Sequence, residues 1–267
     1  MSNSAKVEII AVGSELVSGL IQDTNSAYLA ARVTEQGGEV SRITVLPDSR
    51  EDMLEVFEAA LRRQPAVVLV CGGLGPTPDD MTVEVLCAFA GVDGELHEPL
   101  LQEFMKRRGF TRREQITANL LKMATVPRGS AVHTNPAGWA PCVELTRNGT
   151  TFYLLPGPPR ELQALFSQHL SEALARRSGQ RRVSRRVAVT MHESEVSPHL
   201  ETVMAEFPRT YLKAYVALRQ DSEHALPVDV VCVGQTEESA RDTVGLAVAR
   251  LRELVEGAGK ALTVATG

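Results

Sequence analysis

The sequence predicts an α/β protein whose first part is built on a mostly parallel sheet. Strand-like and helix-like patterns alternate over residues 7–177. The valine-rich run 66–71 is apolar almost throughout, which is typical of a strand covered on both faces. A glycine-rich loop and a helical pattern at 82–90 follow this run directly. Strands alternating with helices over short connections indicate a doubly wound sheet.

Length and composition set the broad class. The chain has 267 residues, enough for one large domain or two ordinary ones, and a net charge of −5, which gives no general attraction to nucleic acid. No apolar stretch is long enough to cross a bilayer, and Glu8 interrupts the first apolar run, so there is no signal-peptide core. We therefore expect a cytoplasmic protein without a membrane partner. The cysteines have no paired spacing, and we predict that they are reduced and buried: Cys71, Cys87, Cys142 and Cys232.

The first two predicted strands end in residues that stop a strand. Residues 7–12 form the first, and either Asp23 or Thr24 can cap the helix that follows to residue 36. Residues 39–46 form the second, which Pro47 stops. A capping-box-like pattern of Ser49 and Asp52 then predicts a helix over residues 49–63.

A helical region and a hairpin complete the first part. We predict one helix from Pro99 to Gly109, and a second, opened by a capping box of Thr111 and Glu114, that runs to about residue 123. Asn148-Gly149 between the runs 141–146 and 151–155 is a strong hairpin signal. The rigid prolines of residues 156–159 then lead into a helix to residue 177.

An arginine-rich stretch at residues 176–186 indicates a domain junction. We therefore predict domains at residues 1–175 and 176–267, the second being a small βαββα unit. Its expected elements are strands at 183–191, 210–218 and 228–234 and helices at 194–207 and 236–256. The arginines read as a solvated linker face, and no Gly-x-x-Gly loop follows them, so we predict no RNA binding.

The loop after the run 66–71 has the residues of an anion site. Gly72, Gly73 and Gly75 can bring backbone N–H groups close to a ligand at a helix N-terminus. Asp79 and Asp80 would repel a bare phosphate, but a divalent cation would bridge them to it. The alternative is that Asp80 only caps the following helix.

Other charged residues follow the first two strands, where ligands of open α/β sheets bind. Glu15 and Asp23 follow the first strand, and Asp48 follows the second, although Asp23 is also a helix-cap candidate and Asp48 a turn residue. Lys122 is a candidate phosphate clamp, or a cation stabilised at a helix C-terminus. We predict Asp80, Asp48 and Lys122 as catalytic residues. The predicted metal ligands are Asp80, Asp79, Asp23 and Glu15.

Other common site patterns are missing from the sequence. There is no Walker-type Gly-Lys-Ser/Thr loop and no Gly-x-Ser-x-Gly elbow. The histidines show no metal-ligand spacing, and we expect them at the surface or in loops: His97, His133, His169, His192, His199 and His224.

Four segments in this order resemble the N-terminal region of the CinA (competence/damage-inducible protein) family, which is related to molybdopterin-binding domains. They are Gly13-Ser14-Glu15-Leu16 with Gly19 and Asp23-Thr24-Asn25; Gly72-Gly73-Leu74-Gly75-Pro76-Thr77 with Asp80 and Thr82; Asn135-Pro136-Ala137-Gly138; and Leu155-Pro156-Gly157-Pro158-Pro159-Arg160-Glu161. The resemblance implies a three-layer molybdopterin-binding-like α/β domain followed by a KH-like α/β domain. On this resemblance, the substrate-binding residues are Gly72, Gly73, Gly75, Thr77, Thr82, Asn25, Asn135, Gly138, Pro156 and Gly157.

The resemblance also implies an activity. It is hydrolysis of the pyrophosphate bond of ADP-ribose to AMP and ribose 5-phosphate, dependent on Mg²⁺, Mn²⁺ or Co²⁺, in a homodimer. The alternative is a non-catalytic molybdopterin- or nucleotide-binding module, as the partner of a separately encoded nicotinamide-mononucleotide deamidase. The sequence shows no counterpart of the family's frequent deamidase domain, so we expect no deamidase activity.

Three residues depart from the family pattern. Trp139 stands where the family often has Thr, Cys142 where it usually has Gly, and Met123 where Gln is common. Trp139 and Cys142 belong to a segment expected near the ligand, so we expect substrate preference to differ here.

Overall fold

The computed structural model describes residues 5–218 and 225–264. The chain forms two compact units, which are described separately. Unit 1 comprises Met1–Thr34 and Gly38–Arg177, and unit 2 comprises Glu35–Gly37 and Ser178–Gly267.

Unit 1 is built on a six-stranded sheet, and the prediction that it is mostly parallel is confirmed. Its strands, in spatial order, are β2 (Glu39–Leu46), β1 (Lys6–Val12), β3 (Val67–Cys71), β8 (Thr150–Leu155), β7 (Cys142–Arg147) and β6 (Ala131–His133). The first four are parallel, and β7 pairs antiparallel with both β8 and β6. The carboxyl ends of four strands therefore meet at one edge of the sheet.

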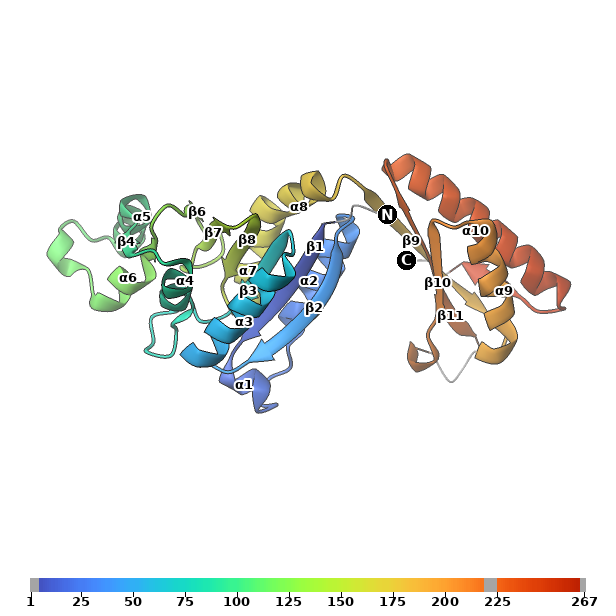
Figure 1. The fold of residues 1–267 in the computed structure, drawn as a ribbon, viewed down its shortest axis with the longest axis horizontal. Helices are drawn as coiled ribbons and strands as arrows, with labels where there is room; N and C mark the ends of the chain where they lie inside the picture. The colour runs from blue at the N-terminus through green and yellow to red at the C-terminus, as the bar shows by residue number, and fades with distance from the viewer. Residues whose placement is uncertain (1–4, 219–224, 265–267) are drawn as a thin grey trace. The chain divides into compact units, whose positions relative to one another are not determined.

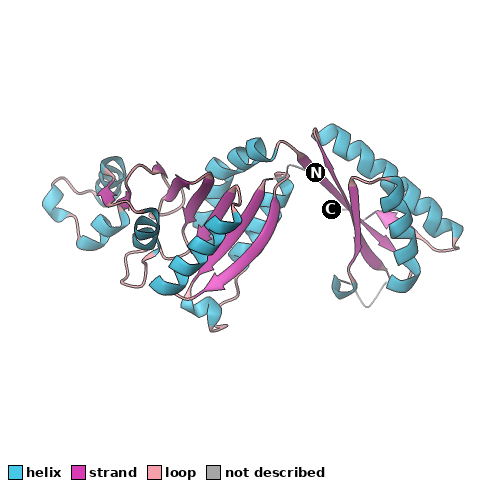
Figure 2. Ribbon diagram, viewed as in Figure 1, coloured by secondary structure: helices cyan, strands magenta, loops and turns pink. Residues whose placement is uncertain are grey.

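Helices cover both faces of this sheet, which gives three layers (Figures 1 and 2). Alternate residues of β3 explain why its sequence is apolar throughout. Val68 and Val70 pack with α3 (Arg50–Arg63) and α4 (Thr82–Ala90). Val67 and Leu69 pack on the opposite face, which is covered by α2 (Thr24–Glu35), α7 (Pro159–Leu165), a π-helical turn (Phe166–Leu170) and α8 (Ser171–Ser178).

Two local predictions are confirmed by backbone geometry. Ser49 caps α3, since its hydroxyl accepts a hydrogen bond from the Asp52 N–H at 3.4 Å. Asn148 and Gly149 join β7 to β8 with φ of 49° and 86°. Two consecutive positive φ values are typical of a tight hairpin turn whose twist matches that of its strands.

The helical region after α4 differs from the prediction at one helix start. It contains β4 (Gly94–Leu96) paired with β5 (Thr125–Pro127), α5 (Glu98–Arg108), a 3₁₀ turn (Arg113–Gln115) and α6 (Ala118–Met123). The predicted helix start at Thr111 is wrong. The Gln115 side chain accepts from the Thr111 and Arg112 N–H groups, which closes a short turn, and Thr117 is the residue that caps α6. A small separate core supports this region: Leu100, Leu101, Phe104, Leu120 and Ala124.

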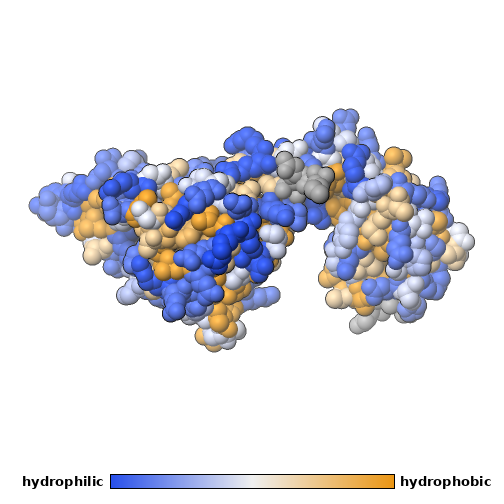
Figure 3. Space-filling view, viewed as in Figure 1, coloured by the Kyte–Doolittle hydropathy of each residue, from blue (hydrophilic) through white to orange (hydrophobic). Residues whose placement is uncertain are grey.

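A short helix, α1 (Ser14–Val17), follows β1 and was not predicted. Its neighbourhood exposes apolar side chains, namely Val17, Leu20 and Ile21. Figure 3 shows an apolar patch where α1 lies and a mainly hydrophilic surface over α3.

Unit 2 has the predicted βαββα order. Its elements are β9 (Arg181–Val189), α9 (Glu193–Glu206), β10 (Thr210–Ala214), β11 (Leu226–Gly234), α10 (Glu237–Gly257) and a further strand, β12 (Leu262–Val264). The strands form an antiparallel sheet in the order β10-β11-β9-β12. The strand predicted over 210–218 is too long, because it ends at Ala214 and a 3₁₀ turn follows.

The arginines predicted as a linker face lie mostly within β9. Arg186 donates to both carboxylate oxygens of Asp229 on the neighbouring strand, at 2.6 and 2.8 Å. Val187 and Val189 of the same strand are buried, and Arg186, one residue before Val187, points to the opposite face of the sheet, so it belongs to an outward strand face and not to a linker.

Two absences concern residues 5–218 and 225–264. No helix there is both long and apolar enough to span a membrane. The four cysteines are buried and free of disulfides, as predicted, and burial raises the pKa of the Cys71 thiol to about 12.

Candidate functional site

A cavity of about 600 Å³ lies where the parallel strands of unit 1 end. Gly13 follows β1, Asp48 follows β2, Gly72 follows β3 and Pro156 follows β8, and all four residues line it. We call it the large cavity. A parallel sheet brings the carboxyl ends of its strands together, which is why segments far apart in sequence share this site.

The glycine loop needs its first two glycines for packing reasons. Gly72 and Gly73 have φ of 107° and 69°. A Cβ atom on Gly72 would lie 2.1 Å from the Val12 carbonyl oxygen, and one on Gly73 would lie 2.1 Å from Thr82 Oγ1. The Thr82 hydroxyl donates to the Gly72 carbonyl at 2.9 Å. Thr82 was predicted to bind substrate, but it is fully buried and lines neither cavity of the site. Its hydrogen bond stabilises the glycine loop.

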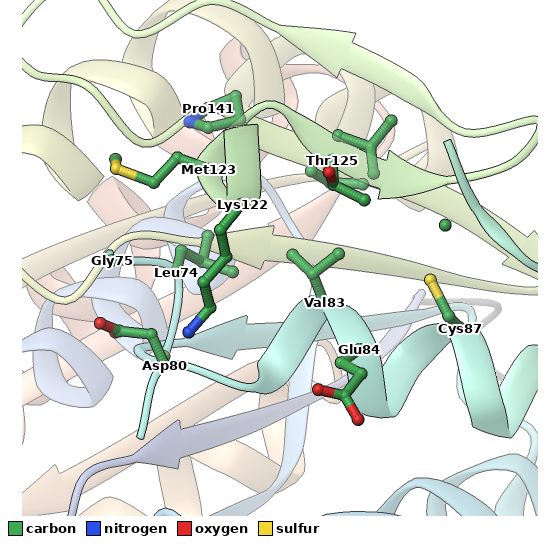
Figure 4. Close-up of a pocket in the computed structure, with 14 residues that line it drawn as sticks. Leu74, Gly75, Asp80, Val83, Glu84, Cys87, Lys122, Met123, Thr125 and Pro141 are labelled. Atoms are coloured by element: carbon green, nitrogen blue, oxygen red, sulfur yellow. The ribbon is translucent and has the colours of Figure 1, made fainter. Parts of the chain in front are cut away.

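Asp80 closes the next turn of this loop. Its Oδ2 atom accepts hydrogen bonds from the Thr77 N–H, at 2.8 Å, and from the Thr77 hydroxyl. The residue at the N-cap position of α4 is Met81, and no side-chain hydrogen bond caps the helix there. Asp80 therefore does not cap α4. Lys122, from α6, donates to the Thr77 carbonyl. Figure 4 shows Lys122 extending toward the loop that carries Asp80. In this arrangement Thr77 and Lys122 hold the loop in shape.

Carboxylates are the main charged side chains that line the large cavity. They come from α1, from the loops after β2 and β3 and from the first turn of α7: Glu15, Asp48, Asp79, Asp80 and Glu161. Asp48 Oδ2 accepts from the Ser14 N–H at 2.8 Å and hydroxyl at 2.9 Å. Interaction with the Thr77 side chain lowers the pKa of Asp79. Several acidic side chains face one space, an arrangement that favours binding of a cation.

The predicted metal ligands only partly converge. Glu15, Asp79 and Asp80 line the large cavity, whereas Asp23 does not. Asp23 Oδ1 instead accepts a hydrogen bond from the Ser26 N–H at 2.9 Å. Asp23 therefore caps α2, which was the alternative to a role as metal ligand. Across the described part of the chain, no three acidic, histidine or cysteine side chains form a ready-made metal cluster. The oxygen donors nevertheless fit a hard cation such as Mg²⁺, which usually binds one or two carboxylates and completes its shell with water and substrate phosphates.

The other predicted binding residues divide into two groups. Gly72, Gly73, Gly75, Pro156 and Gly157 line the large cavity. Asn25, Asn135 and Gly138 line neither this cavity nor the second one described below. The Asn25 side chain donates to the Gly157 carbonyl at 2.7 Å, so it supports the loop after β8.

Glu161 is a site residue missing from the sequence-based set. Its Oε2 accepts from the Asn135 side chain at 2.8 Å, and Asn135 also donates to the Ala140 carbonyl at 2.8 Å. Burial raises the pKa of Glu161, and hydrogen bonds from Trp139, Asn135 and Ala140 partly offset this. The Glu161 side chain thus connects α7 to the loop 135–140. Its position two residues after the Pro-Gly-Pro-Pro segment was the available sequence signal.

Arg108, from the C-terminal end of α5, is the second residue missing from that set. Among the described residues that line the large cavity, it is the one with a basic side chain. Its guanidinium carbon lies 4.9 Å from the centroid of the Trp139 ring, and Trp139 lines the same cavity. No sequence pattern places Arg108 here, because the contact depends on how α5 folds back over the loop 135–140.

A second cavity, of about 250 Å³, adjoins the first. Gly73, Gly75 and Asp80 line both cavities. The remaining lining is largely apolar, with Val83 and Cys87 of α4, Val126, Pro141 and Val143, and it includes the charged side chains of Lys122 and Glu84 (Figure 4). We call it the small cavity. The glycine loop and Asp80 therefore separate an acidic space from an apolar one.

The stacked pair of His133, in β6, and His169, in the π-helical turn, corrects the expectation that the histidines are surface or loop residues; His224 lies outside the described residues. Their ring centroids are 4.8 Å apart, and His133 Nε2 lies 3.2 Å from Glu144 Oε2. His169 Nε2 is buried without a partner among the described residues. Neither histidine lines the large or the small cavity.

Comparisons with known proteins agree with this architecture. Residues 8–176 match the family model described as a probable molybdopterin binding domain. A relative from Pyrobaculum calidifontis is 34% identical over 250 residues, which cover 93% of this chain and 95% of the relative.

Two further matches carry the CinA name. A CinA-like protein from Myxococcus xanthus is 42% identical over 161 residues, covering 60% of this chain and 38% of that protein. The crystal structure of the protein CinA from Thermoplasma acidophilum, whose function is described as unknown, is 33% identical with a TM-score of 0.60. The match covers 65% of this chain and 99% of the Thermoplasma acidophilum chain. The chain therefore belongs to the probable molybdopterin binding domain family, and residues 8–176 form a CinA-type member of it.

Proposed function

We propose that unit 1 hydrolyses the pyrophosphate bond of a nucleotide diphosphate-type substrate, with ADP-ribose giving AMP and ribose 5-phosphate. The observation that carries this proposal is the shared wall between the two cavities. Gly73, Gly75 and Asp80 line both, so a ligand centred on this wall has room on either side. A pyrophosphate with a substituent at each end has this shape.

The proposal includes a divalent cation, Mg²⁺, Mn²⁺ or Co²⁺, held by Asp80 with Asp79 and Glu15. When bound, the cation neutralises charge on the phosphate oxygens, which the surrounding carboxylates would otherwise repel. Because the protein carboxylates do not form a complete cluster, the substrate phosphates supply part of the coordination in this proposal.

The remaining chemistry belongs to side chains of this chain. Water attacks one phosphorus atom, the bond from that phosphorus to the bridging oxygen breaks, and the bridging oxygen leaves with the other phosphate. The proton of the water passes to a carboxylate. Asp48 is suited to accept it, because its Oδ2 is held by Ser14 while its Oδ1 accepts no hydrogen bond from the described residues.

A chromatographic assay tests this function. The purified protein is incubated with ADP-ribose, FAD or NAD, with each of the three metals or with chelator. We expect AMP to form from ADP-ribose only with metal. Asp80→Asn weakens metal binding, and loss of several kcal/mol of charge stabilisation should reduce the rate about 100-fold or more, whereas Asp242→Asn, on the exposed surface of α10, should leave it unchanged. Metal-independent turnover, or full activity of Asp80→Asn, would refute the assignment.

A second function is supported by the family itself, whose model describes probable molybdopterin binding. In that case the two cavities bind a pterin or nucleotide without hydrolysing it. Calorimetric binding with no product under any metal condition would establish this non-catalytic module in place of the hydrolase.

A further inference from the structure

Trp139 forms a fixed aromatic wall of the large cavity. Its ring packs against Phe104 of the small core, with centroids 5.4 Å apart and planes at 59°. The Arg107 guanidinium carbon lies 5.7 Å from the ring centroid. The indole is therefore supported from α5, while part of it remains exposed to the cavity.

The loop that carries Trp139 is held by hydrogen bonds on two sides. From α5, Arg107 donates to the carbonyls of Gly138 and Asn135 and also pairs with Glu103. From α7, Glu161 accepts from the buried Asn135 side chain. Trp139 thus has a defined position in the absence of ligand, which lowers the entropy that binding would cost.

Arg108 differs from its neighbour Arg107 in its interactions. Among the described residues, Arg108 makes no hydrogen bond or ion pair, and its guanidinium lies over the indole of Trp139. Five carboxylates line the same cavity, yet none is within ion-pair distance of it. The cation is therefore available to an anionic group of a ligand, and its guanidinium already lies over an aromatic ring.

We propose that Arg108 and Trp139 recognise a planar nitrogen heterocycle that carries a phosphate. The guanidinium pairs with the phosphate, and the heterocycle stacks against the Arg108–Trp139 pair. This deepens the proposed function by naming which end of the substrate faces the large cavity: the purine or pterin end. The small cavity then receives the other substituent of the pyrophosphate.

The recognition has a chemical consequence that can be measured. AMP carries both a planar ring and a phosphate, whereas ribose 5-phosphate lacks the ring and adenosine lacks the phosphate. Base stacking on an aromatic side chain contributes roughly a tenfold increase in affinity or more. AMP should therefore bind at least about tenfold tighter than either fragment.

Trp139 is the only tryptophan of the chain, so its fluorescence reports directly on this wall. The experiment titrates the full-length protein with AMP, adenosine, ribose 5-phosphate and a phosphorylated pterin, without added metal and again with Mg²⁺. Excitation at the red edge of the indole band avoids adenine absorption. We expect saturable quenching by AMP or by the phosphorylated pterin, and the tighter of the two identifies the heterocycle.

Three variants separate recognition from general electrostatics. Arg108→Met should weaken AMP binding about tenfold, and Arg108→Lys should recover only part of it because the ammonium lacks a planar face. Lys106→Met is the matched control. It removes one positive charge from the same exposed helix end, but Lys106 does not line the large cavity, so AMP binding should stay unchanged. Trp139→Leu, followed by calorimetry, should weaken AMP binding by a similar factor.

The outcomes distinguish this inference from the proposed hydrolysis. Quenching of Trp139 by AMP without any product from ADP-ribose would refute hydrolysis and retain the recognition element. Hydrolysis of ADP-ribose with equal AMP affinity in Arg108→Met, Lys106→Met and the unmodified protein would refute the recognition element alone. Equal affinities for AMP and ribose 5-phosphate would also refute it, because the ring would then contribute nothing.

Discussion

Gly138 and Glu161 are in contact so close that no side chain fits between them. A Cβ atom built on Gly138 would lie 1.9 Å from Cδ of Glu161. Glu161 in turn accepts a hydrogen bond from Asn135 at 2.8 Å. A side chain at position 138 would therefore have to displace the Glu161 carboxylate, and the hydrogen bond from Asn135 opposes that displacement.

Replacing Gly138 by alanine should displace either the loop or Glu161. We expect Gly138→Ala to destabilise unit 1 by about 1–3 kcal/mol, the usual cost of overpacking, and to weaken AMP binding because Trp139 moves with the loop. Denaturant unfolding and Trp139 fluorescence measure the two effects. Gly245→Ala, inside α10, is the matched control: a Cβ there meets nothing within 4 Å, so stability should stay the same or increase. Unaltered stability and ligand affinity in Gly138→Ala would contradict the prediction.

Arg63 and Glu8 form an ion pair whose acidic partner is almost fully buried. Arg63 donates to the two carboxylate oxygens of Glu8 at 2.6 and 2.5 Å, and the Glu8 side chain is 3% exposed. Arg63→Ala leaves that carboxylate buried without its partner, so we expect a loss of about 2–3 kcal/mol in the free energy of unfolding.

A second bidentate pair provides the comparison for Arg63. Arg250 donates to both oxygens of Glu206 at 2.8 and 3.0 Å, but the Glu206 side chain is 39% exposed. Water replaces the lost partner there, so Arg250→Ala should change stability little. Equal losses for the two variants, measured by urea unfolding, would show that burial of Glu8 does not decide the cost.

The buried hydrogen bond of the Thr82 hydroxyl should stabilise the glycine loop. Thr82→Val keeps the shape of the side chain but leaves the buried Gly72 carbonyl without its donor, at a cost of about 1–3 kcal/mol. Thr202→Val also removes a hydroxyl that donates to a backbone carbonyl, that of Pro198, at 2.9 Å. Thr202 is exposed, so water takes over and stability should hardly change. Thermal unfolding of both variants tests the contrast, and similar shifts in the two would count against it.

His169 should make unit 1 less stable at mildly acidic pH. Burial and the nearby His133 lower the pKa of His169 below its ordinary value of 6.5. The folded protein thus binds this proton more weakly than the unfolded chain does. The stabilisation is complete above pH 6.5 and is lost as the pH falls through the folded-state pKa. We expect the melting temperature to fall over this window and His169→Gln to reduce the fall. An identical pH dependence in the variant would show that other groups are responsible.

Much of the fold follows from local sequence patterns. The apolar run 66–71 becomes a strand buried on both faces, and Asn148-Gly149 becomes the turn of a hairpin, because each depends on neighbouring residues. The helix predicted from Thr111 begins instead at Ala118, because two possible caps, Thr111 and Thr117, compete six residues apart. Short strands such as β12 were missed because three residues carry too little periodicity to be recognised.

The candidate site divides in the same way. The sequence by itself determined where four strands end and that Gly13, Asp48, Gly72 and Pro156 follow them, since strand ends are marked by local turn residues. Only the tertiary structure decided that Asp23 caps a helix while Asp48 faces the cavity. It alone brought Arg108 over Trp139 and Glu161 beneath Gly138. These contacts join residues more than twenty positions apart, and the packing of α5 and α7 around the loop 135–140 creates them, so no local pattern specifies them.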